Sequence, residues 1–392
     1  MNLRGDLPSP HSSDAESMVD AVRRLVEDVV LPSVERWDRE DVLPEEVLER
    51  LGALGVPGAL VPARYGGREL PVSAMVEVWR TLAQGWISLT GAVNTTALAT
   101  ELLVRYGTEE QRARWLPGIA AGEVWASFSV TEPGAGSDLR RIETWVEPAH
   151  EGLIVTGRKR WIAGGFSFPL AFMLANVKGQ LRPSCILLPA GGRGSATWTV
   201  EPLDKLGYRG VESAAWRFDG HHARGAEILG GAAGDGQGAR QMLDVLGVGR
   251  VNVACRALGI IDRALECGLD EATGRRIGRG MLGDHSHTQL RIGEVRGRQL
   301  VVEAAVRRAA EAIDAGEADA AERASAAKTM ASESAVWAVE LASRLAASRS
   351  YIVGSELARL RRDAPQTQIG EGANDALLIA AGKAAIKRRK AS

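Results

Sequence analysis

The amino-acid sequence predicts an α+β protein of several domains, in the order helical, β and helical again. Apolar residues recur at helical spacing in the first and last parts of the chain. The middle part instead contains short β-prone runs separated by turn residues. A length of 392 residues leaves room for two or three domains. The predicted divisions are a flexible tail at 1–12, an N-terminal helical domain at 13–125, a middle β domain at 126–235 and a C-terminal helical bundle at 236–392.

Start signals and periodicity predict the N-terminal helices. Ser13 and Glu16 have the spacing of a capping box, in which each side chain accepts a hydrogen bond from the backbone N–H of the other residue. Thr108 and Gln111 repeat this spacing before a later helix. Apolar residues follow the first capping box at intervals that place them on one helical face. These residues are Met18, Val22, Leu25, Val26 and Val29.

From about residue 126 the pattern of apolar and turn-forming residues changes. Short apolar runs are separated by Gly, Pro and Asp at hairpin-like distances, which predicts strands joined by turns. The runs are GLIVTG (152–157), LAFMLANV (170–177), SCILLPA (184–190), TWTVEPL (197–203) and AAWRFDG (214–220).

Long amphipathic helices are predicted again after the glycine-rich segment 230–238. The simplest interpretation of their apolar stripes is the core of a helical bundle. The stripes comprise Val295, Val302, Val306, Ala310 and Ile313, then Met330, Trp337, Leu341 and Leu345.

Composition argues against several classes of function. Lys and Arg number 48 against 49 Asp and Glu, so no net field attracts nucleic acid or an anionic membrane. No uninterrupted apolar run approaches the roughly 20 residues that span a bilayer, and no N-terminal secretory signal is found. The KRRK sequence at 387–390 is short and indicates a solvated end rather than a nucleic-acid arm. We expect a cytoplasmic protein.

No metal site is predicted. Histidines pair at 221–222 and at 285 and 287, but neither pair has a third ligand in register. The three cysteines are scattered and lack CxxC spacing, which also argues against a disulfide framework. They are Cys185, Cys255 and Cys267.

Three short motifs could carry chemistry. VTEPGAGSDL at 130–139 could cradle a phosphate or a flavin edge with consecutive backbone N–H groups, although a turn capped by Ser137 and Asp138 explains it equally well. GRKRWIAGG at 157–165 could present Trp161 as a wall against a flat ligand, although a buried core tryptophan is the commoner explanation.

The third motif is QTQIGEGAND at 366–375, in which Glu371 lies between Gly370 and Gly372. An isolated motif of this kind is usually a turn with a solvated glutamate. Glycines also let another molecule approach the main chain closely, so a functional carboxylate is the alternative.

In this order, the motifs resemble the acyl-CoA dehydrogenase family over roughly residues 14–388. The resemblance implies helices at the N-terminus, a central β-barrel-like domain and a C-terminal four-helix bundle, assembled as a homodimer or homotetramer. Five segments carry it, of which the third and fifth are fairly specific to the family. They are VPARYGG (61–67), VRYGTEEQRARWLPGIAAGE (104–123), VTEPGAGSD (130–138), GRKRWI (157–162) and RDAPQTQIGEG (362–372).

The resemblance implies a role for Glu371. In the family, the glutamate at this position removes the α proton of an acyl thioester while FAD takes the β hydride. The thioester would be carried by coenzyme A or an acyl carrier protein, and an electron-transfer flavoprotein or oxygen would accept the electrons. Arg250 would start the bundle helix that faces the thioester entrance, and Arg275 would reach across a dimer to the FAD pyrophosphate. The implied cofactor-binding residues are Phe128, Val130, Thr131, Gly136, Ser137, Trp161, Ile162 and Arg275, and the implied substrate-binding residues are Ser137, Arg250 and Gly372.

The sequence departs from the family pattern around the cofactor. In the pocket for the ADP half, Gly278-Arg279 replaces a Phe-Gly pair, Ser286 replaces a Gln, and Ala347-Ser348 replaces a Gly-Gly pair. We therefore expect FAD to bind more weakly than is usual for the family. Residues near the base and the flavin also differ, and they are Gly370, Ala373 and Ala163.

Two other functions stay open at this point. An enzyme with little or no FAD could use Glu371 for proton transfer alone, in an isomerisation or elimination. A non-catalytic acyl-binding subunit would keep the fold without the chemistry. An absorbance spectrum of the purified protein separates dehydrogenation from both.

Overall fold

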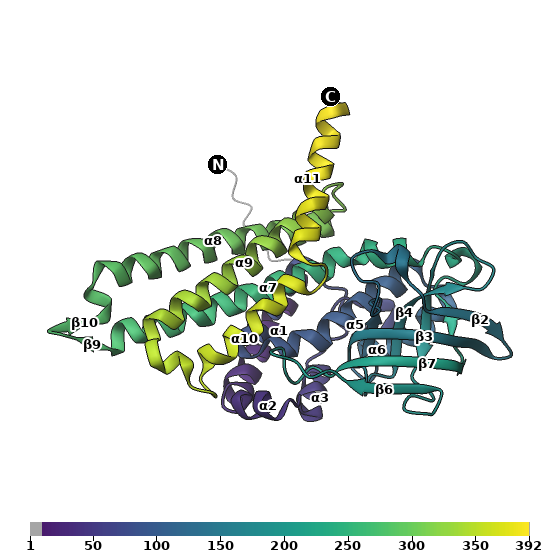
Figure 1. The fold of residues 1–392 in the computed structure, drawn as a ribbon, viewed down its shortest axis with the longest axis horizontal. Helices are drawn as coiled ribbons and strands as arrows, with labels where there is room; N and C mark the ends of the chain where they lie inside the picture. Colours follow the sequence, from purple (N-terminus) through teal and green to yellow (C-terminus); the bar gives the residue numbers. More distant parts are fainter. Residues whose placement is uncertain (1–9, 392) are drawn as a thin grey trace.

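The computed structural model describes residues 10–391 and shows helices at both ends of the chain with a β domain between them (Figure 1). The predicted order of helical, β and helical parts is confirmed. The predicted tail lies mostly outside the described residues. Helix α1 (Pro10–Leu25) begins three residues before the predicted start at Ser13. Proline suits the first helical position because its missing N–H has no partner to lose there.

The N-terminal part contains six α-helices among the described residues. The capping box at Thr108 is confirmed: the Gln111 N–H donates to Thr108 Oγ1 at 3.2 Å, and the Thr108 N–H donates to Gln111 Oε1 at 3.1 Å. The predicted stripe on α1 is buried at Met18, Val22 and Leu25. The helices after α1 are α2 (Val34–Glu40), α3 (Glu45–Ala53), α4 (Val72–Gly85), α5 (Ile87–Tyr106) and α6 (Glu109–Ala120).

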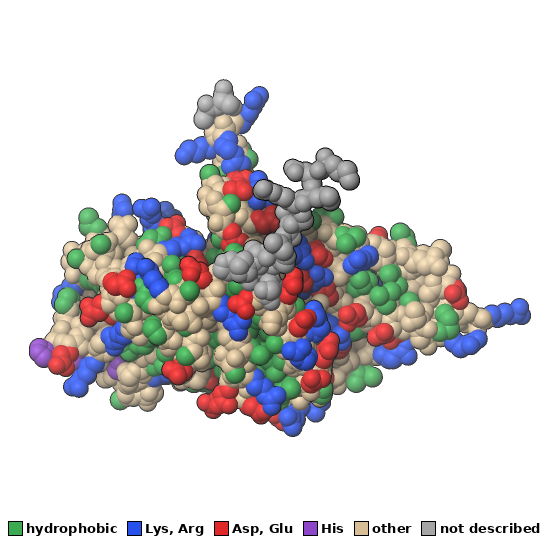
Figure 2. All heavy atoms as spheres, turned by 180° about the vertical axis from the view of Figure 1, so that it is seen from behind, with side chains coloured by type: hydrophobic (Ala, Val, Ile, Leu, Met, Phe, Trp, Pro, Cys, Tyr) green, Lys and Arg blue, Asp and Glu red, His purple; other side chains and the backbone are tan. Residues whose placement is uncertain are grey.

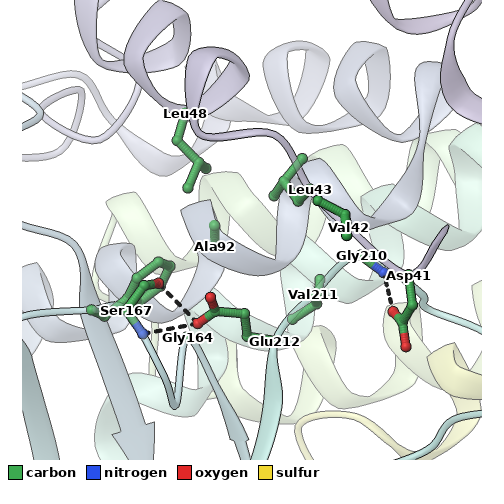
Figure 3. Close-up of a pocket in the computed structure, with 11 residues that line it drawn as sticks. Asp41, Val42, Leu43, Leu48, Ala92, Gly164, Ser167, Gly210, Val211 and Glu212 are labelled. Atoms are coloured by element: carbon green, nitrogen blue, oxygen red, sulfur yellow. Dashed lines mark hydrogen bonds between the residues drawn. The ribbon is translucent and has the colours of Figure 1, made fainter. Parts of the chain in front are cut away.

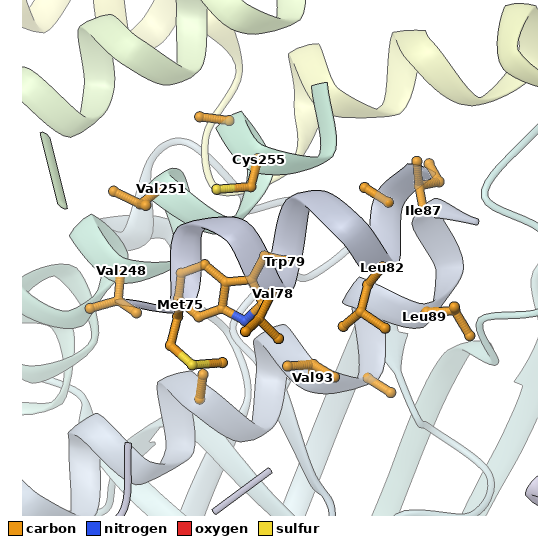
Figure 4. Close-up of a cluster of buried hydrophobic side chains, with 14 of the residues drawn as sticks. Met75, Val78, Trp79, Leu82, Ile87, Leu89, Val93, Val248, Val251 and Cys255 are labelled. Atoms are coloured by element: carbon orange, nitrogen blue, oxygen red, sulfur yellow. The ribbon is translucent and has the colours of Figure 1, made fainter. Parts of the chain in front are cut away.

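Helix α5 is the central helix of the molecule. It packs against α4, against the bundle helix α7 (Gly238–Gly274) and against strand β1 (Ala126–Ser129). Figure 4 shows side chains of α4, α5 and α7 meeting in one apolar cluster around Trp79, which is fully buried. By length and composition α5 could cross a membrane, but 89% of its apolar window is buried inside the protein, as in the core helix of a globular fold.

The β domain contains eight strands in the order β6-β7-β3-β2-β4-β5-β8, with β1 paired to β4. The five predicted runs form β3 to β7. Strands that follow each other in the sequence do not always pair in the sheet. Strand β4, for example, pairs in parallel with both β1 and β2. The strands are β2 (Trp145–Ala149), β3 (Gly152–Ala163), β4 (Leu170–Val177), β5 (Ser184–Pro189), β6 (Trp198–Pro202), β7 (Ser213–Arg224) and β8 (Glu227–Ile228).

The loop between β6 and β7 leaves the β domain and reaches the helices. The Tyr208 N–H donates to Asp363 Oδ1 at 2.7 Å, and a Cβ atom on Gly207 would lie 2.1 Å from the Arg362 carbonyl oxygen. Burial raises the pKa of the Asp363 carboxyl group to about 6. Position 207 must therefore be glycine, because any side chain would collide with the backbone at Arg362. The close contact holds the neighbouring Tyr208 between the helices.

The C-terminal part is a four-helix bundle followed by one further helix. The bundle contains α7, α8 (Ser286–Asp314), α9 (Ala320–Ala346) and α10 (Glu356–Ile369). A short hairpin of β9 (Arg276–Ile277) and β10 (Gly280–Met281) joins α7 to α8 at the end of the bundle far from the β domain (Figure 1).

Two predictions about the bundle are wrong. Met330 was placed in the core stripe but is 53% exposed, because the buried face of α9 carries alanines and Lys328 instead. Arg250 does not start the bundle helix, since α7 begins at Gly238 and places Arg250 three turns inside it.

The last helix, α11 (Asn374–Ala391), projects away from the body of the molecule (Figure 1). Lys and Arg side chains gather on it towards its end (Figure 2). Arg388 pairs with Glu322 of α9 at 2.8 Å, so the basic end of α11 contacts the bundle.

Helix α9 ends in a backbone conformation that suits glycine. Ala347 has φ 53° and ψ −128°, which a Cβ atom disfavours. Strain of this kind costs on the order of 1–3 kcal/mol. The surrounding structure therefore holds Ala347 in a geometry for which its side chain is unsuited.

We predict that Ala347→Gly stabilises the fold by about 1 kcal/mol, because it relieves this strain at some cost in backbone entropy. Thermal or urea unfolding of the two proteins would measure the gain. Ala346→Gly is the matched control: Ala346 has an ordinary φ of −74°, so glycine there should destabilise the fold by about 0.5–1 kcal/mol. Equal effects of the two substitutions would contradict the assignment of strain to Ala347.

Candidate functional site

Glu371 lies in the short loop between α10 and α11, with its side chain half-buried. Its φ is 53°, so this carboxylate sits on a left-handed backbone that few non-glycine residues adopt. Asn94 of α5 donates from Nδ2 to Glu371 Oε1 at 2.7 Å. The carboxyl group lies against Gly249 of α7, where a Cβ atom would be 3.0 Å from Glu371 Cδ. The site therefore needs a small residue at position 249.

Two cations hold the loop from behind. Arg250 donates from Nε to the Glu371 carbonyl oxygen at 3.2 Å. Lys328 donates from Nζ to the carbonyl oxygens of Gln368 at 3.0 Å and Gly372 at 2.7 Å, and to Asn374 Oδ1 at 2.8 Å. All three ammonium protons are used, and the contacts lie on both sides of Glu371 along the chain.

Lys328 is an unusual buried charge. It has no exposed surface and makes no ion pair among the described residues. Burial lowers the pKa of its ammonium group to about 8, an effect that Glu371 and Glu333 oppose and Arg250 strengthens. Burial also lowers the pKa of Arg250, again against the attraction of Glu371. The carboxylate of Glu371 thus attracts both cations.

The same loop offers free hydrogen-bond donors. In the described part of the chain, the N–H groups of Glu371 and Gly372 donate to no acceptor, while their carbonyl oxygens are bound by Arg250 and Lys328. The carbonyls therefore point at the cations, and the two N–H groups are left for a ligand. An oxygen that gains negative charge during a reaction is stabilised by donors of this kind.

The loop at 130–138 is fixed to the β domain by a buried ion pair. Lys159 Nζ lies 2.7 Å from Glu132 Oε1, and Glu132 also accepts the N–H groups of Glu143 and Thr144 at 2.7 and 3.1 Å. Although burial alone would raise it, the pKa of Glu132 is held below its usual value by Lys159. Burial lowers the pKa of Lys159 to about 8.

Beyond this anchor the loop is open. Thr131 is half-buried, and Gly136 and Ser137 are exposed. Within the described residues, the N–H groups of Gly134, Gly136 and Ser137 donate to no acceptor. They form the kind of donor-rich turn that binds anions and polar ring edges.

Trp161 lies at the end of β3 beside this loop, because the neighbouring Arg160 N–H donates to the Thr131 carbonyl oxygen at 2.8 Å. Its φ is 63° and it is 57% exposed, so the alternative of a buried core tryptophan is wrong. Arg160 holds its guanidinium 5.5 Å from the Trp161 ring centroid. The other face of the indole is available to a flat ligand.

The remaining predicted residues fall in three places. Phe128 and Val130 are half-buried at the end of β1, next to the loop. Ile162 is fully buried in the sheet core and lies behind the site rather than on it. Arg275 lies at the far end of α7, where it donates to the Leu345 carbonyl oxygen at 3.0 Å. Within one chain, this end of α7 lies at the opposite end of the molecule from β3, which carries Trp161 (Figure 1).

Helix α5 connects the two halves of the site. Asn94 contacts Glu371, and two residues later Thr96 Oγ1 accepts the N–H of Ala126 in β1 at 3.2 Å. One buried helix thus fixes the carboxylate relative to the strand that leads into the loop at 130–138.

Sequence reasoning missed Asn94 and Lys328. Both left a signal: Asn94 is the only amide side chain in the sequence of α5, and Lys328 interrupts a stripe of alanines on α9. A polar residue on a buried stripe marks a contact that the helix needs.

A cavity of about 140 Å³ lies elsewhere, between the α2–α3 connection, α5 and the β3–β4 turn (Figure 3). Ala92 of α5 lines it, whereas Asn94 faces Glu371. Glu212 closes one side and accepts the Ser167 N–H at 2.9 Å. This cavity does not border Glu371. No cluster of three metal-ligating side chains occurs in residues 10–391.

Comparison with known proteins gives three family matches in chain order. They are the acyl-CoA dehydrogenase N-terminal domain at residues 12–123, the middle domain at 127–221 and the C-terminal domain at 236–386. The chain belongs to the acyl-CoA dehydrogenase family. Members of this family are flavin oxidoreductases, so the chain is an enzyme of that type.

Individual relatives are distant. A (2S)-methylsuccinyl-CoA dehydrogenase of Cereibacter sphaeroides is 30% identical over 67% of this chain, a match that spans 50% of the relative. Butyryl-CoA dehydrogenase from Megasphaera elsdenii has a TM-score of 0.90 at 23% identity, covering 97% of this chain and 100% of that one. The prolyl acyl carrier protein oxidase AnaB has a TM-score of 0.86 at 22% identity, covering 95% and 98%. Both structures show the same fold.

The residues near Trp161 fit a flavin. Free N–H groups at Gly136 and Ser137 suit its polar edge or phosphate, and the exposed indole suits its ring. The fit at the ADP end is poorer. Ala347 keeps a glycine-like φ of 53° but adds a Cβ atom.

We predict that Lys328→Met lowers turnover at least tenfold, because the loop that carries Glu371 loses three hydrogen bonds to a charged donor, each worth about 1.5–3 kcal/mol. Flavin content and KM should change much less than kcat. The control is Lys383→Met, an exposed lysine of α11. If Lys328 acts only through Glu371, adding Lys328→Met to Glu371→Gln should cause no further loss. A full additional loss in the double variant would mean a general structural role.

The pH dependence of stability follows from the same residue. The Lys328 pKa is about 8 in the folded chain and 10.5 as its ordinary value, so the unfolded chain binds more protons between these values. Stability contributed by this group should therefore rise as pH increases from about 8 to 10.5. Lys328→Met should remove that rise, which urea unfolding at pH 8 and 10 would measure.

Proposed function

We propose that this protein catalyses the α,β-dehydrogenation of an acyl thioester, with Glu371 as the base and FAD as the hydride acceptor. One observation carries the proposal: a single loop presents both a carboxylate and free N–H groups. Glu371 is oriented by Asn94 at 2.7 Å, and the N–H groups of Glu371 and Gly372 have no acceptor among the described residues.

This combination suits the removal of a proton next to a thioester. As the proton leaves Cα, negative charge develops on the carbonyl oxygen, which the free N–H groups can stabilise. The carboxylate accepts the proton directly as a general base. Bound FAD would supply the acceptor for the hydride from Cβ. The protein's own residues therefore account for proton removal and for stabilisation of the enolate.

The cofactor would be held mainly by the loop at 130–138 and by Trp161. Thr131, Gly136 and Ser137 lie on that loop, and Phe128 and Val130 lead into it. Arg275 would come from a second subunit, so we propose a homodimer or homotetramer.

The carrier of the acyl group is coenzyme A or an acyl carrier protein. Relatives with either kind of name share the fold, as butyryl-CoA dehydrogenase and the prolyl acyl carrier protein oxidase do. Electrons would pass to an electron-transfer flavoprotein or to oxygen, and we propose that the reaction takes place in the cytoplasm. We propose Ser137, Arg250 and Gly372 as the residues that bind the thioester.

The test begins with the purified protein. A flavin absorbance spectrum, with FAD rather than FMN released on denaturation, is expected. Bleaching of that spectrum by an acyl thioester shows dehydrogenation. A colourless protein that exchanges the α proton of a thioester would instead support isomerisation or elimination, and one that only binds thioesters would support a non-catalytic subunit.

We predict that Glu371→Gln lowers turnover about 10²–10⁴-fold, because the amide cannot accept the proton while its size and its bond to Asn94 are kept. The expected change lies in kcat, with flavin content and melting temperature near those of the parent. Glu201→Gln, an exposed glutamate on β6, is the control. Near-normal turnover of Glu371→Gln would refute its role as the base.

A further inference from the structure

The space next to the Glu371 carboxylate is enclosed by α5 and α7. Asn94 of α5 binds Oε1, and Gly249 of α7 lies against Cδ. One turn further along α7 is Asn252, which has no exposed surface, and Asn94 is only 2% exposed. Asn94 therefore touches the carboxylate, and Asn252 lies one helical turn from the glycine that the carboxylate packs against.

Beyond these amides the seam between the two helices is filled. Arg256 donates from NH1 to Tyr208 Oη at 2.9 Å, and its NH2 approaches the Thr90 carbonyl oxygen at 3.4 Å. The Tyr208 hydroxyl lies so close to Gly91 that a Cβ atom there would be 2.1 Å away. Polar side chains therefore fill the space between α5 and α7. A long alkyl chain would need an open apolar tunnel there.

The orientation of both amides is fixed by chemistry. A carboxylate only accepts hydrogen bonds, so Asn94 must turn Nδ2 towards Glu371 and Oδ1 away from it. A guanidinium only donates, so Asn252 must turn Oδ1 towards Arg256, at 2.9 Å, and Nδ2 away. Within the described chain, Asn94 Oδ1 and Asn252 Nδ2 are buried and have no partner. The site therefore presents one unpaired acceptor and one unpaired donor.

Unpaired buried groups discriminate between ligands. A purely alkyl acyl group would cover both atoms and leave each without a hydrogen bond, which is costly. A group that can both donate and accept would pair with both. Sites built to hydrogen-bond a hydroxyl or amine reject analogues that lack it far more strongly than apolar pockets reject a missing methylene.

We propose that the acyl group deprotonated by Glu371 is short and carries a hydroxyl substituent, which donates to Asn94 Oδ1 and accepts from Asn252 Nδ2. This inference rests on the proposed function and specifies its substrate class.

Binding to the parent protein, with its flavin chemically reduced beforehand, tests the inference without turnover and keeps the carboxylate that orients Asn94. Butanoyl, 4-hydroxybutanoyl and octanoyl groups would be offered as coenzyme A thioesters and on a phosphopantetheine carrier protein, with Kd measured by calorimetry. The hydroxylated group should bind about tenfold or more tighter than butanoyl. Octanoyl should bind no tighter than butanoyl, whereas an open apolar tunnel would tighten binding about fourfold for each methylene.

The variant Asn252→Asp isolates the donor. Its carboxylate still accepts from Arg256 but has no N–H, so the preference for 4-hydroxybutanoyl should fall at least fivefold at unchanged melting temperature. Asn252→Ala removes the acceptor for Arg256 as well as the donor. Comparing the two variants separates loss of the N–H donor from loss of the hydrogen bond to Arg256.

The outcomes separate the proposed substrate class from the proposed function. Equal affinities for the two four-carbon groups, tightest binding of octanoyl, or an undiminished preference in Asn252→Asp would overturn the substrate class. The proposed function would still stand if any of the thioesters bleached the flavin of the parent protein. If no thioester bound the reduced parent protein or bleached the oxidised one, both would be refuted.

Discussion

The burial of α5 is the constraint on which the rest of the structure depends. This one helix packs against the N-terminal helix α4, the bundle helix α7 and strand β1, so it is shared by all three parts of the chain. Its apolar sides form the common core, and its single amide contacts Glu371. Gly91 of α5 allows Tyr208 to approach closely, and Gly249 of α7 does the same for Glu371. The contact surface between α5 and α7 is therefore both part of the core and one wall of the site.

The electrostatics of the site follow from that packing. Arg250 and Lys328 approach the loop from α7 and α9 and bind carbonyl oxygens, so the peptide groups present their N–H ends to the opposite side. Buried charges are costly unless hydrogen-bonded, and here the main chain of the loop supplies most of the partners. The positive charge behind the loop favours a substrate oxygen that gains negative charge. The proposed substrate class depends on a separate feature, the two buried amides on α5 and α7.

Local sequence patterns predicted the domain order, the Thr108 capping box and the strands, because each depends on neighbouring residues. The resemblance to the family identified Glu371 and the loop at 130–138, and the structure shows Trp161 exposed beside that loop. Asn94 and Lys328 escaped prediction because their partners are 277 and 40–46 residues away in sequence. Met330 was misplaced since an alanine stripe carries too little contrast to fix which helix face is buried. The family match placed Arg250 at a helix start, whereas α7 already begins at Gly238.

The left-handed backbone at Glu371 has a consequence for how variants of this enzyme would be selected. A glycine at position 371 would remove the strain recorded by its φ of 53° and would stabilise the fold, yet it would delete the carboxylate. If Glu371 is the base proposed above, selection for folding alone and selection for turnover favour different residues at this position. A screen for heat-resistant variants that does not also measure catalysis would then enrich inactive proteins.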